Sequence, residues 1–311
     1  MSIVVLGAVF VDIKGYPAGK YIPGGRNAGR VEYVHGGVSR NIAEDIGNLE
    51  LRPTFISLVD DTGTGADVLS RLNSHNVDTR YIQRVPDGMG TWLAVFNGCS
   101  DVEAAISKRP DLTPITALLD EKGDEIFSQA DSILLEIDMD KSIVSRVFTL
   151  AARYGRPVYA AVSNMSIALE RREFLRQVDC FVCNAQEAGI LFSQCYENRS
   201  PEELTKVLAD DIAGACISSM VVTLGESGAV WADASGKTGI CPAIPVPVAD
   251  TTGAGDAFFS GVAVGLTYGK SLAASCDIGT RLAASVIRIS DNTCPRFMPG
   301  EFGITLPVQN G

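Results

Sequence analysis

The sequence has little positive charge and almost no histidine. Its 311 residues include 26 Lys and Arg against 37 Asp and Glu, a formal net charge of −11, and only 2 histidines. No basic run is interleaved with aromatic residues, so we expect no nucleic-acid partner. No apolar run approaches the roughly 20 residues of a membrane-spanning helix, so we expect no membrane partner. Because no charged-then-apolar leader precedes Ile3, we expect a cytoplasmic protein.

Patterns for disulfides and metal sites are scarce as well. The 8 cysteines are scattered through apolar segments, which is typical of reduced core thiols. Cys180-x-x-Cys183 is the single close pair, and a zinc site would need a second pair. The two histidines share no obvious partner, but His35 stands beside two glycines and is a candidate for lining a site.

Two common phosphate-binding motifs each fail at one position. Ser235-Gly236-Lys237-Thr238 has the end of a P-loop, but Trp231 stands where the first glycine should be. A dinucleotide fingerprint beginning at Gly63 lacks its third glycine, because Val68 occupies that position. The first segment is better explained as a hairpin turn between strands at 229–232 and 238–241.

Short β-branched runs alternate with helical patterns along the chain. Buried strands are predicted at Ile3–Leu6, Thr54–Leu58, Ser132–Leu135, Pro157–Ala161, Cys180–Cys183 and Met220–Leu224. Helices are predicted at Ser39–Leu49, Ala66–Ser74, Lys141–Tyr154, Gln186–Phe192, Pro201–Ala213, Gly253–Thr267 and Ser271–Ile289. This order predicts an α/β fold whose parallel sheet is covered on both faces. Active sites in such sheets lie beyond the carboxyl ends of strands, where Asp12, Asn184, Thr223 and Gly225 are expected.

The run Asp250–Gly261 sets a turn of small residues and a carboxylate at the start of an apolar helix. Gly253 and Gly255 let the backbone approach a ligand, and the free amides of a first helical turn suit one anion. A carboxylate at Asp256 would repel that anion unless it faces an incoming hydroxyl and accepts its proton. The alternative is that Asp256 only caps the helix.

The Asp-Thr-Thr-Gly-Ala-Gly-Asp-Ala-Phe segment resembles the C-terminal signature of the PfkB (ribokinase-like) sugar and nucleoside kinases. Gly7–Asp12 and His35-Gly36-Gly37-Val38-Ser39-Arg40-Asn41 resemble the same family's substrate-binding strand end and di-glycine motif. The resemblance implies a ribokinase-like three-layer α/β/α sandwich with a mainly parallel central sheet and a small β-lid. We expect one kinase domain over 1–311, with the lid built from about 12–36 and 88–110.

Two further segments resemble the nucleotide side of these kinases. Asn184-Ala185-Gln186-Glu187 is similar to the family's Asn-x-x-Glu motif, which implies that Asn184 and Glu187 hold Mg²⁺ through water; the same letters also form an ordinary helix cap. Thr223-Leu224-Gly225-Glu226-Ser227-Gly228 is similar to the loop that contacts ATP phosphates, although a hairpin turn gives the same pattern.

The resemblance also implies a mechanism and its residues. ATP would place its γ-phosphate on the amides of Gly253, Ala254, Gly255 and Asp256, with Asp256 as general base. The acceptor would be held by Asp12, Gly36, Gly37, Arg40 and Asn41, with a surface ion pair as the alternative for Arg40 and a plain turn as the alternative for the glycines. Thr252 would contact phosphate, and Asp250 would hold a monovalent cation such as K⁺ or cap the turn.

The acceptor is expected to be a sugar or nucleoside. The Gly-Gly-Val-x-Arg-Asn pattern with Asp12 resembles the pseudouridine-phosphorylating members of the family, so the pseudouridine 5′-hydroxyl is the first expectation. A kinase for a free sugar or sugar phosphate and a non-catalytic ligand-binding relative are the alternatives. A sugar phosphate would need a basic cluster, for which Arg40, Lys108 and Arg109 are the candidates. Exposed aromatic residues on the small lid predict a homodimer formed through it.

Overall fold

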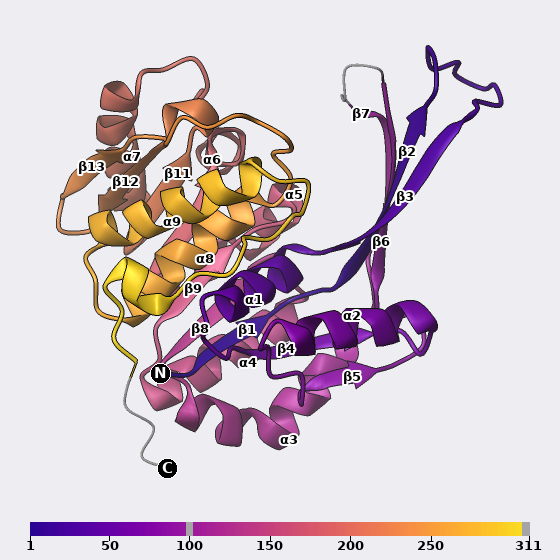
Figure 1. The fold of residues 1–311 in the computed structure, drawn as a ribbon. Helices are drawn as coiled ribbons and strands as arrows, with labels where there is room; N and C mark the ends of the chain where they lie inside the picture. The colour runs from indigo at the N-terminus through magenta and orange to yellow at the C-terminus, as the bar shows by residue number, and fades with distance from the viewer. Residues whose placement is uncertain (98–101, 307–311) are drawn as a thin grey trace.

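The computed structural model describes residues 1–97 and 102–306, which form a large and a small β-sheet with helices around the large one (Figure 1). The large sheet has nine strands in the order β13-β12-β11-β10-β9-β8-β1-β4-β5. Its pairs from β5 to β11 are parallel, while β12 and β13 continue the edge in antiparallel pairing. The strands are β1 (Ile3–Leu6), β4 (Thr54–Val59), β5 (Ile82–Arg84), β8 (Ser132–Glu136), β9 (Val158–Ala161), β10 (Cys180–Asn184), β11 (Ser219–Thr223), β12 (Ala229–Asp233) and β13 (Thr238–Cys241).

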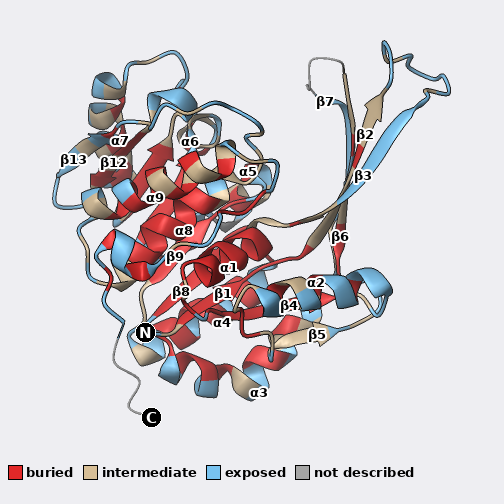
Figure 2. Ribbon diagram, viewed as in Figure 1, coloured by how far each residue is buried: buried red, intermediate tan, exposed pale blue. Residues whose placement is uncertain are grey.

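Alternating side chains of this sheet enter two separate cores. On β1, Val4 and Leu6 face one core while Ile3 and Val5 face the other, because successive side chains of a strand point to opposite faces. The first core is covered by α3 (Thr113–Gln129), α4 (Lys141–Tyr154), α5 (Met165–Ala168), α6 (Ala185–Phe192) and α7 (Pro201–Ala215). The second is covered by α1 (Val38–Asn48), α2 (Gly63–Ser74), α8 (Ala254–Thr267) and α9 (Leu272–Ile287). The predicted three-layer sandwich is confirmed, and buried residues fill its middle (Figure 2).

The small sheet has four strands in the order β3-β2-β6-β7, and Figure 1 shows it standing away from the sandwich. Its strands are β2 (Phe10–Pro17), β3 (Gly29–Gly36), β6 (Gly90–Phe96) and β7 (Val102–Lys108). β2 pairs antiparallel with β3 and parallel with β6, and β6 pairs antiparallel with β7. The strand β3 and the whole of β7 are largely exposed (Figure 2). The sheet therefore has little core of its own.

In the part of the chain that the structure describes, 3₁₀ helices lie at Leu169–Gln177, Gly225–Ser227 and Pro299–Phe302. No helix within the described ranges is long and apolar enough to cross a membrane. The carboxyl ends of β1, β8, β10 and β11 lie along one edge of the large sheet, since these strands run parallel. β2 and β3 leave and return to that edge, which brings the small sheet to the place where a site is expected.

Candidate active site

The start of α8 is a turn that only glycine fits. Gly253 is the N-cap residue with a φ of 82°, and a β-carbon there would lie 2.0 Å from the carbonyl oxygen of Asn292. Within the described chain, no backbone carbonyl accepts from the amides of Gly255 and Asp256, and the space in front of Gly255 is open. Free amides at a helix N-terminus attract anions. The turn can therefore hold a phosphoryl group.

Asp256 points toward α1 and away from the backbone of its own helix. Its Oδ2 accepts a hydrogen bond of 2.6 Å from Asn41 Nδ2, and it makes no cap bond. Burial raises the pKa of Asp256 to about 7, although the hydrogen bond from Asn41 opposes the shift. The charges of Asp12 and Glu187 raise the pKa further. The group is therefore suited to accept a proton near neutral pH.

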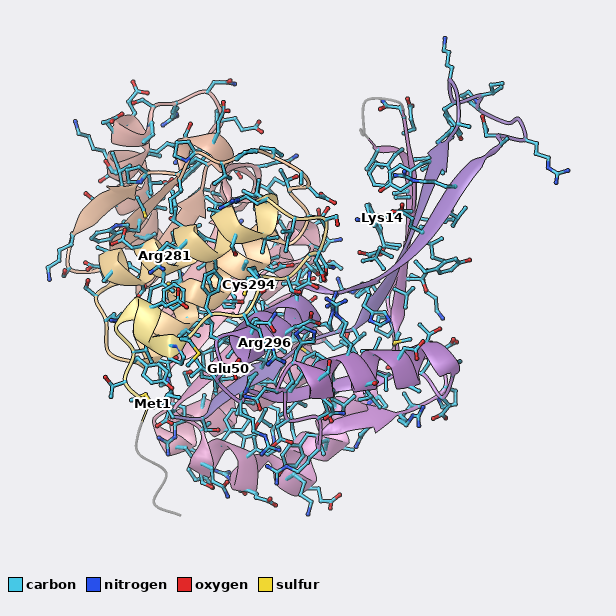
Figure 3. All side chains as sticks on the ribbon, viewed as in Figure 1. Met1, Lys14, Glu50, Arg281, Cys294 and Arg296 are labelled. Atoms are coloured by element: carbon cyan, nitrogen blue, oxygen red, sulfur yellow. The ribbon has the colours of Figure 1, made fainter. Side chains whose placement is uncertain are left out.

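Asn41 and Asp12 approach Asp256 from two other elements. Asn41 lies in the first turn of α1 and is 5% exposed, and its Oδ1 is buried with no hydrogen-bond partner in the described structure. Asp12 lies on β2 so close to Gly36 that a β-carbon at Gly36 would stand 2.5 Å from its carboxylate. Burial raises the pKa of Asp12, while the charge of Lys14 (labelled in Figure 3) lowers it. These polar groups can bind hydroxyls between the two sheets.

The two glycines before α1 are each required for a different steric reason. Gly37 caps α1 with a φ of 100°, and a β-carbon there would lie 2.6 Å from the carbonyl oxygen of Ala8. Gly36 leaves room for the carboxylate of Asp12, as described above. The two positions form the tight turn from β3 into α1, in agreement with the plain-turn alternative.

Arg40 belongs to a buried network. Its guanidinium is 1% exposed and donates 2.8 Å to Glu44 Oε2, and it also donates to the carbonyl oxygen of His35. Burial alone would raise the pKa of Glu44, but hydrogen bonds from Arg71 and the charge of Arg40 lower it to about 2. A surface ion pair, the sequence-based alternative, is wrong because the pair is buried. The geometry supports a role for Arg40 in positioning the turn at His35.

Asn184 and Glu187 form a reciprocal cap on α6. Asn184 Oδ1 accepts from the amide of Glu187, and Glu187 Oε2 accepts from the amide of Asn184, both at 2.8 Å. The ordinary capping alternative therefore describes these residues correctly. Burial raises the pKa of Glu187, and the charge of Glu187 in turn raises the pKa of Asp256.

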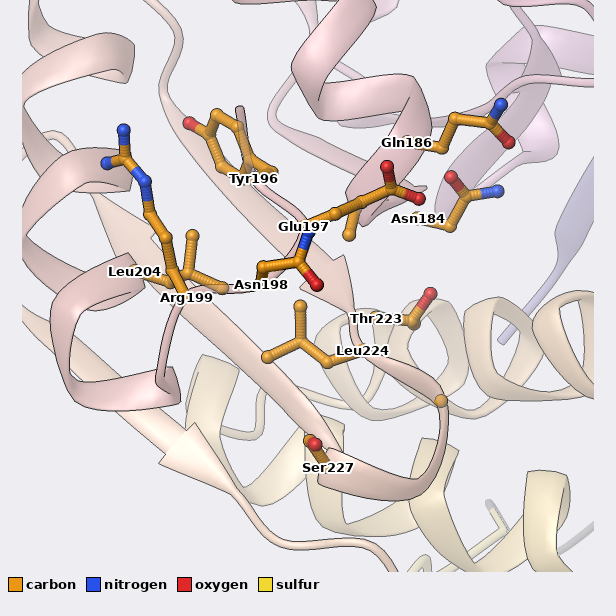
Figure 4. A pocket seen from close by; sticks show the side chains of 12 residues that line it. Asn184, Gln186, Tyr196, Glu197, Asn198, Arg199, Leu204, Thr223, Leu224 and Ser227 are labelled. Carbon is orange, nitrogen blue, oxygen red and sulfur yellow. The ribbon is translucent and has the colours of Figure 1, made fainter. Parts of the chain in front are cut away.

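The segment from Thr223 to Gly228 joins the antiparallel strands β11 and β12, so it is a hairpin turn as the alternative held. Gly225 and Gly228 have φ angles of 60° and 88°, and the amide of Leu224 donates 2.8 Å to the carbonyl of Gly228. The turn borders a cavity of about 380 Å³ (Figure 4). Its lining includes Asn184, Gln186, Arg199, Thr223, Gly225 and Ser227. Of the residues expected on the nucleotide side, Asn184, Thr223 and Gly225 line this cavity, whereas Glu187, Gly228 and Thr252 do not.

Asp250 closes the turn before α8. Its Oδ1 accepts from the amide of Thr252 at 2.9 Å and from the hydroxyl of Thr252 at 2.8 Å, which is the capping arrangement. Across residues 1–97 and 102–306, no group of three or more His, Cys, Asp or Glu side chains could hold a metal ion.

One buried carboxylate at this edge was missed by the sequence reasoning. Glu136 ends β8, is 2% exposed, and accepts hydrogen bonds from Ser39 Oγ at 3.0 Å and from the amide of Ala8 at 3.2 Å. Burial raises its pKa to about 7, and the charge of Asp138 raises it further. The one feature of the sequence that could have identified Glu136 is its place directly after the apolar run Ser132–Leu135.

The basic residues considered for binding an acceptor phosphate are all paired. Arg40 pairs with Glu44, Lys108 with Asp87 at 2.9 Å, and Arg109 with Asp138 at 2.8 Å. These three side chains therefore do not form the basic cluster that a sugar phosphate would need.

Comparison with known proteins places this architecture in a family. Residues 1–293 match the model of the pfkB family carbohydrate kinases. The chain is 31% identical to the guanosine-inosine kinase of Exiguobacterium acetylicum over 94% of this chain and 96% of that protein. It is 25% identical to the pseudouridine kinase of Escherichia coli strain K12 over 84% of this chain and 82% of that protein. The structure of Arabidopsis thaliana ribokinase complexed with ribose and ATP superposes with a TM-score of 0.82 at 20% identity, covering 97% of this chain and 99% of that one. The chain belongs to the pfkB family of carbohydrate kinases and is a phosphotransferase of that family.

Proposed function

We propose that this kinase transfers the γ-phosphoryl group of ATP to a hydroxyl of a nucleoside, with Asp256 as general base. The observation that carries the proposal is the pairing of a carboxylate whose pKa is about 7 with free helix-start amides in the same turn. The carboxylate suits an attacking hydroxyl, and the amides suit the phosphoryl group that it attacks.

The chain's own groups divide the reaction between them. Asp256 accepts the proton of the attacking hydroxyl while the oxygen forms a bond to the γ-phosphorus and the bond to ADP breaks. Asn41 orients the carboxylate by donating 2.6 Å to Oδ2. The amides of Gly255 and Asp256 hold the transferred group, while Gly253 and Ala254 shape the turn, with the Ala254 amide donating 3.2 Å to the carbonyl of Thr251. No covalent enzyme intermediate is needed.

ATP occupies the cavity at Asn184, Thr223 and Gly225. Gly228 shapes the turn beside that cavity, and Thr252, in the turn before α8, would contact the phosphates. Mg²⁺ bound to ATP would neutralise charge on the phosphate oxygens. Asn184 and Glu187 could contact Mg²⁺ through water, because the capping hydrogen bond uses Glu187 Oε2 and leaves Oε1 out of the cap. Asp250 Oδ2 likewise takes no part in the turn with Thr252, which is compatible with a K⁺ ion beside it.

The acceptor enters between the two sheets, and the small sheet acts as its lid within one kinase domain. Asp12 and Asn41 bind the sugar hydroxyls, Gly36 and Gly37 bring the backbone close, and Arg40 holds that turn in place. The pairing of the candidate basic residues disfavours a sugar phosphate. The similarity to kinases named for guanosine-inosine and for pseudouridine supports a nucleoside 5′-hydroxyl, with these three nucleosides as the candidates.

A second subunit covers the outer face of the small sheet. Tyr33 is 73% exposed, Ile106 is 70% exposed and Val31 is 59% exposed on that face. Exposed apolar patches of this kind favour protein contacts. A homodimer through the lid therefore remains our expectation, as does a cytoplasmic location.

An ADP-release assay with an acceptor panel tests the proposal. The panel contains guanosine, inosine, pseudouridine, ribose, fructose and fructose 6-phosphate, with adenosine for comparison. We expect a nucleoside to give a kcat/KM at least tenfold above those of the free sugars. A free sugar or sugar phosphate that wins by tenfold would overturn the nucleoside assignment. ADP release no higher than in the absence of acceptor, across the whole panel, would favour the non-catalytic alternative.

A further inference from the structure

The face of the small sheet that carries Asp12 continues outward as an aromatic surface. Asp12 lies directly opposite Trp92 in the pairing of β2 with β6, and opposed residues in a sheet share a face. Two residues farther along β2, Lys14 lies opposite Ala94, and Tyr16 follows beside Phe96. We call this face, with Asp12, Lys14, Tyr16, Trp92 and Phe96, the inner face of the small sheet.

The aromatic side chains of the inner face contact one another. Tyr16 and Phe96 stack with ring centroids 5.0 Å apart, and Trp92 meets Phe96 edge-on at 6.2 Å. Ala94, which lies between Trp92 and Phe96 on the same face, is too small to cover the rings. Tyr16 is already contacted by Phe96 and by the Arg30 guanidinium, which lies 4.1 Å from its ring centroid. Trp92 and Phe96 are not fully buried, so their rings offer surface to a ligand.

Lys14 is the unexplained group on this face. Its side chain is 6% exposed, yet it makes no hydrogen bond or ion pair to any residue in the described part of the chain. The neighbouring carboxylate of Glu32 pairs instead with Arg30 at 3.1 Å. An ammonium group can only donate hydrogen bonds, so Lys14 Nζ needs an acceptor. No protein acceptor in the described residues meets it, so Nζ is free to donate to a ligand.

Geometry connects this lysine to the acceptor. Residues two apart on a strand are separated by roughly 7 Å, so Lys14 lies about that far beyond Asp12 in the direction away from the sandwich. A nucleoside whose ribose hydroxyls reach Asp12 would extend its base over the same distance. The base would then contact both the rings and the ammonium group.

We infer that the inner face of the small sheet is a nucleobase subsite, in which Trp92 and its neighbouring rings stack on the base and Lys14 Nζ donates to a carbonyl oxygen of the base. The inference rests on the proposed function and narrows its acceptors. Bases with a carbonyl at the contacted position, as in inosine, guanosine and pseudouridine, bind well. Adenosine binds poorly, because its amino group also donates and cannot accept from Lys14.

The first test compares inosine with adenosine, which carry an oxygen and an amino group at the same ring position. Lys14→Met keeps the length of the side chain and its packing but removes the donor. We expect the wild-type enzyme to prefer inosine, and Lys14→Met to lower kcat/KM for inosine by roughly 10- to 100-fold, as for loss of a charged hydrogen bond. The adenosine value should change less than threefold. Lys108→Met, which removes an exposed charge from the same sheet, is the matched control and should leave the ratio unchanged.

The second test needs no turnover. The chain has 2 tryptophans, so Trp231→Phe leaves Trp92 as the single reporter. Stacking predicts that inosine changes the Trp92 emission in the absence of ATP and that ribose does not. Trp92→Leu should weaken inosine binding in calorimetry by roughly tenfold, the usual order for one stacked base.

The outcomes separate the two proposals. An equal loss for inosine and adenosine in Lys14→Met, or Trp92 emission that ignores nucleosides, overturns the base subsite while nucleoside kinase activity can stand. If fructose 6-phosphate is the best acceptor and Lys14→Met abolishes its use, Lys14 binds a phosphate and the carbonyl assignment is wrong. ADP release that no acceptor raises refutes the proposed function, and the emission test still decides whether the inner face binds a base.

Discussion

Replacement of Asp256 by asparagine separates a catalytic base from a structural residue. Asn keeps the size of the side chain and an oxygen that can accept from Asn41 Nδ2, which now donates 2.6 Å to the carboxylate. It loses only the ability to take a proton. We expect kcat to fall by roughly 10²–10⁴, the usual contribution of a positioned acid–base group. The affinity for ATP should stay the same or improve, because a negative charge beside the γ-phosphate is gone.

The pKa of Asp256 determines whether activity rises or falls with pH. Because only the ionised carboxylate accepts a proton, kcat/KM of the wild-type enzyme should rise with pH and level off above about 7. In the Asp256→Asn variant this rise should disappear. The measurement is kcat/KM from pH 5.5 to 8.5 with the best nucleoside of the panel.

Stability changes in the opposite direction from activity. A carboxylate whose folded pKa lies near 7, well above its unfolded value, stabilises the fold below pH 4 and loses that contribution as pH rises through 7. Asn has no such loss, so Asp256→Asn should melt at a higher temperature than wild type at pH 8. A folded Asp256→Asn enzyme with near-normal turnover would refute the catalytic assignment. Lower stability together with retained activity would point to a structural role.

Further predictions concern the turn, the buried network, the dimer and the cation. Gly253→Ala should destabilise the protein by roughly 1–3 kcal/mol, because Gly253 has a positive φ and a β-carbon there would clash with the backbone. Gly255→Ala should melt within roughly 2 °C of wild type in a thermal scan, as for a surface change. Equal melting temperatures for the two variants would contradict the steric argument. Glu44→Gln should lower the free energy of unfolding, measured in urea at pH 7, by about 3–5 kcal/mol. The difference from wild type should shrink below pH 4.5, because the Glu44 carboxylate, whose pKa is about 2 in the folded protein, contributes less stability to the wild type as the pH falls. A difference that does not change with pH would contradict this prediction. Tyr33→Glu should convert a dimer to a monomer in sedimentation, and a monomeric wild type removes the lid interface. Asp250→Ala should abolish any activation by K⁺ over Na⁺, and activation that persists would place the cation elsewhere.

Most strands of the sandwich could be predicted closely because their signal is local, although the three-residue strand β5 was missed. Runs such as Ile3–Leu6 and the hairpin at 229–241 are apolar stretches bounded by turns, and they were found within a residue or two. The helix at Thr113–Gln129 was missed because its second half carries Asp120–Asp124, a charged run interrupted by Gly123. That glycine has a packing reason that no local pattern reveals: a β-carbon there would lie 2.5 Å from Leu150 Cδ1.

The roles of site residues could be predicted where a local motif sets the geometry of the backbone. They were harder to predict where the role of a side chain depends on its burial in the folded protein. The turn at Gly253 follows from the small residues around it. The environment of Arg40 depends on Asn292, which lies 252 positions away and donates to the same carbonyl of His35. The burial of Lys14 depends on the pairing of β2 with β6, which joins strands far apart in the chain. Such contacts are products of the tertiary fold and leave no periodic trace in the sequence.

The two halves of the candidate site come from different parts of the fold. The phosphate side that we propose is built from the ends of β10 and β11 and the start of α8, all on the large sheet or packed against it. The acceptor side that we propose is built from β2 and β6 of the small sheet, which the chain inserts between elements of the sandwich. The hydrogen bond from Asn41 to Asp256 joins α1, which follows the small-sheet strand β3, to the start of α8. Strands of the small sheet can therefore change at positions such as Lys14 and Trp92 without disturbing the base or the anion-binding turn. This arrangement allows acceptor preference to diverge among kinases of this fold while phosphoryl transfer is retained.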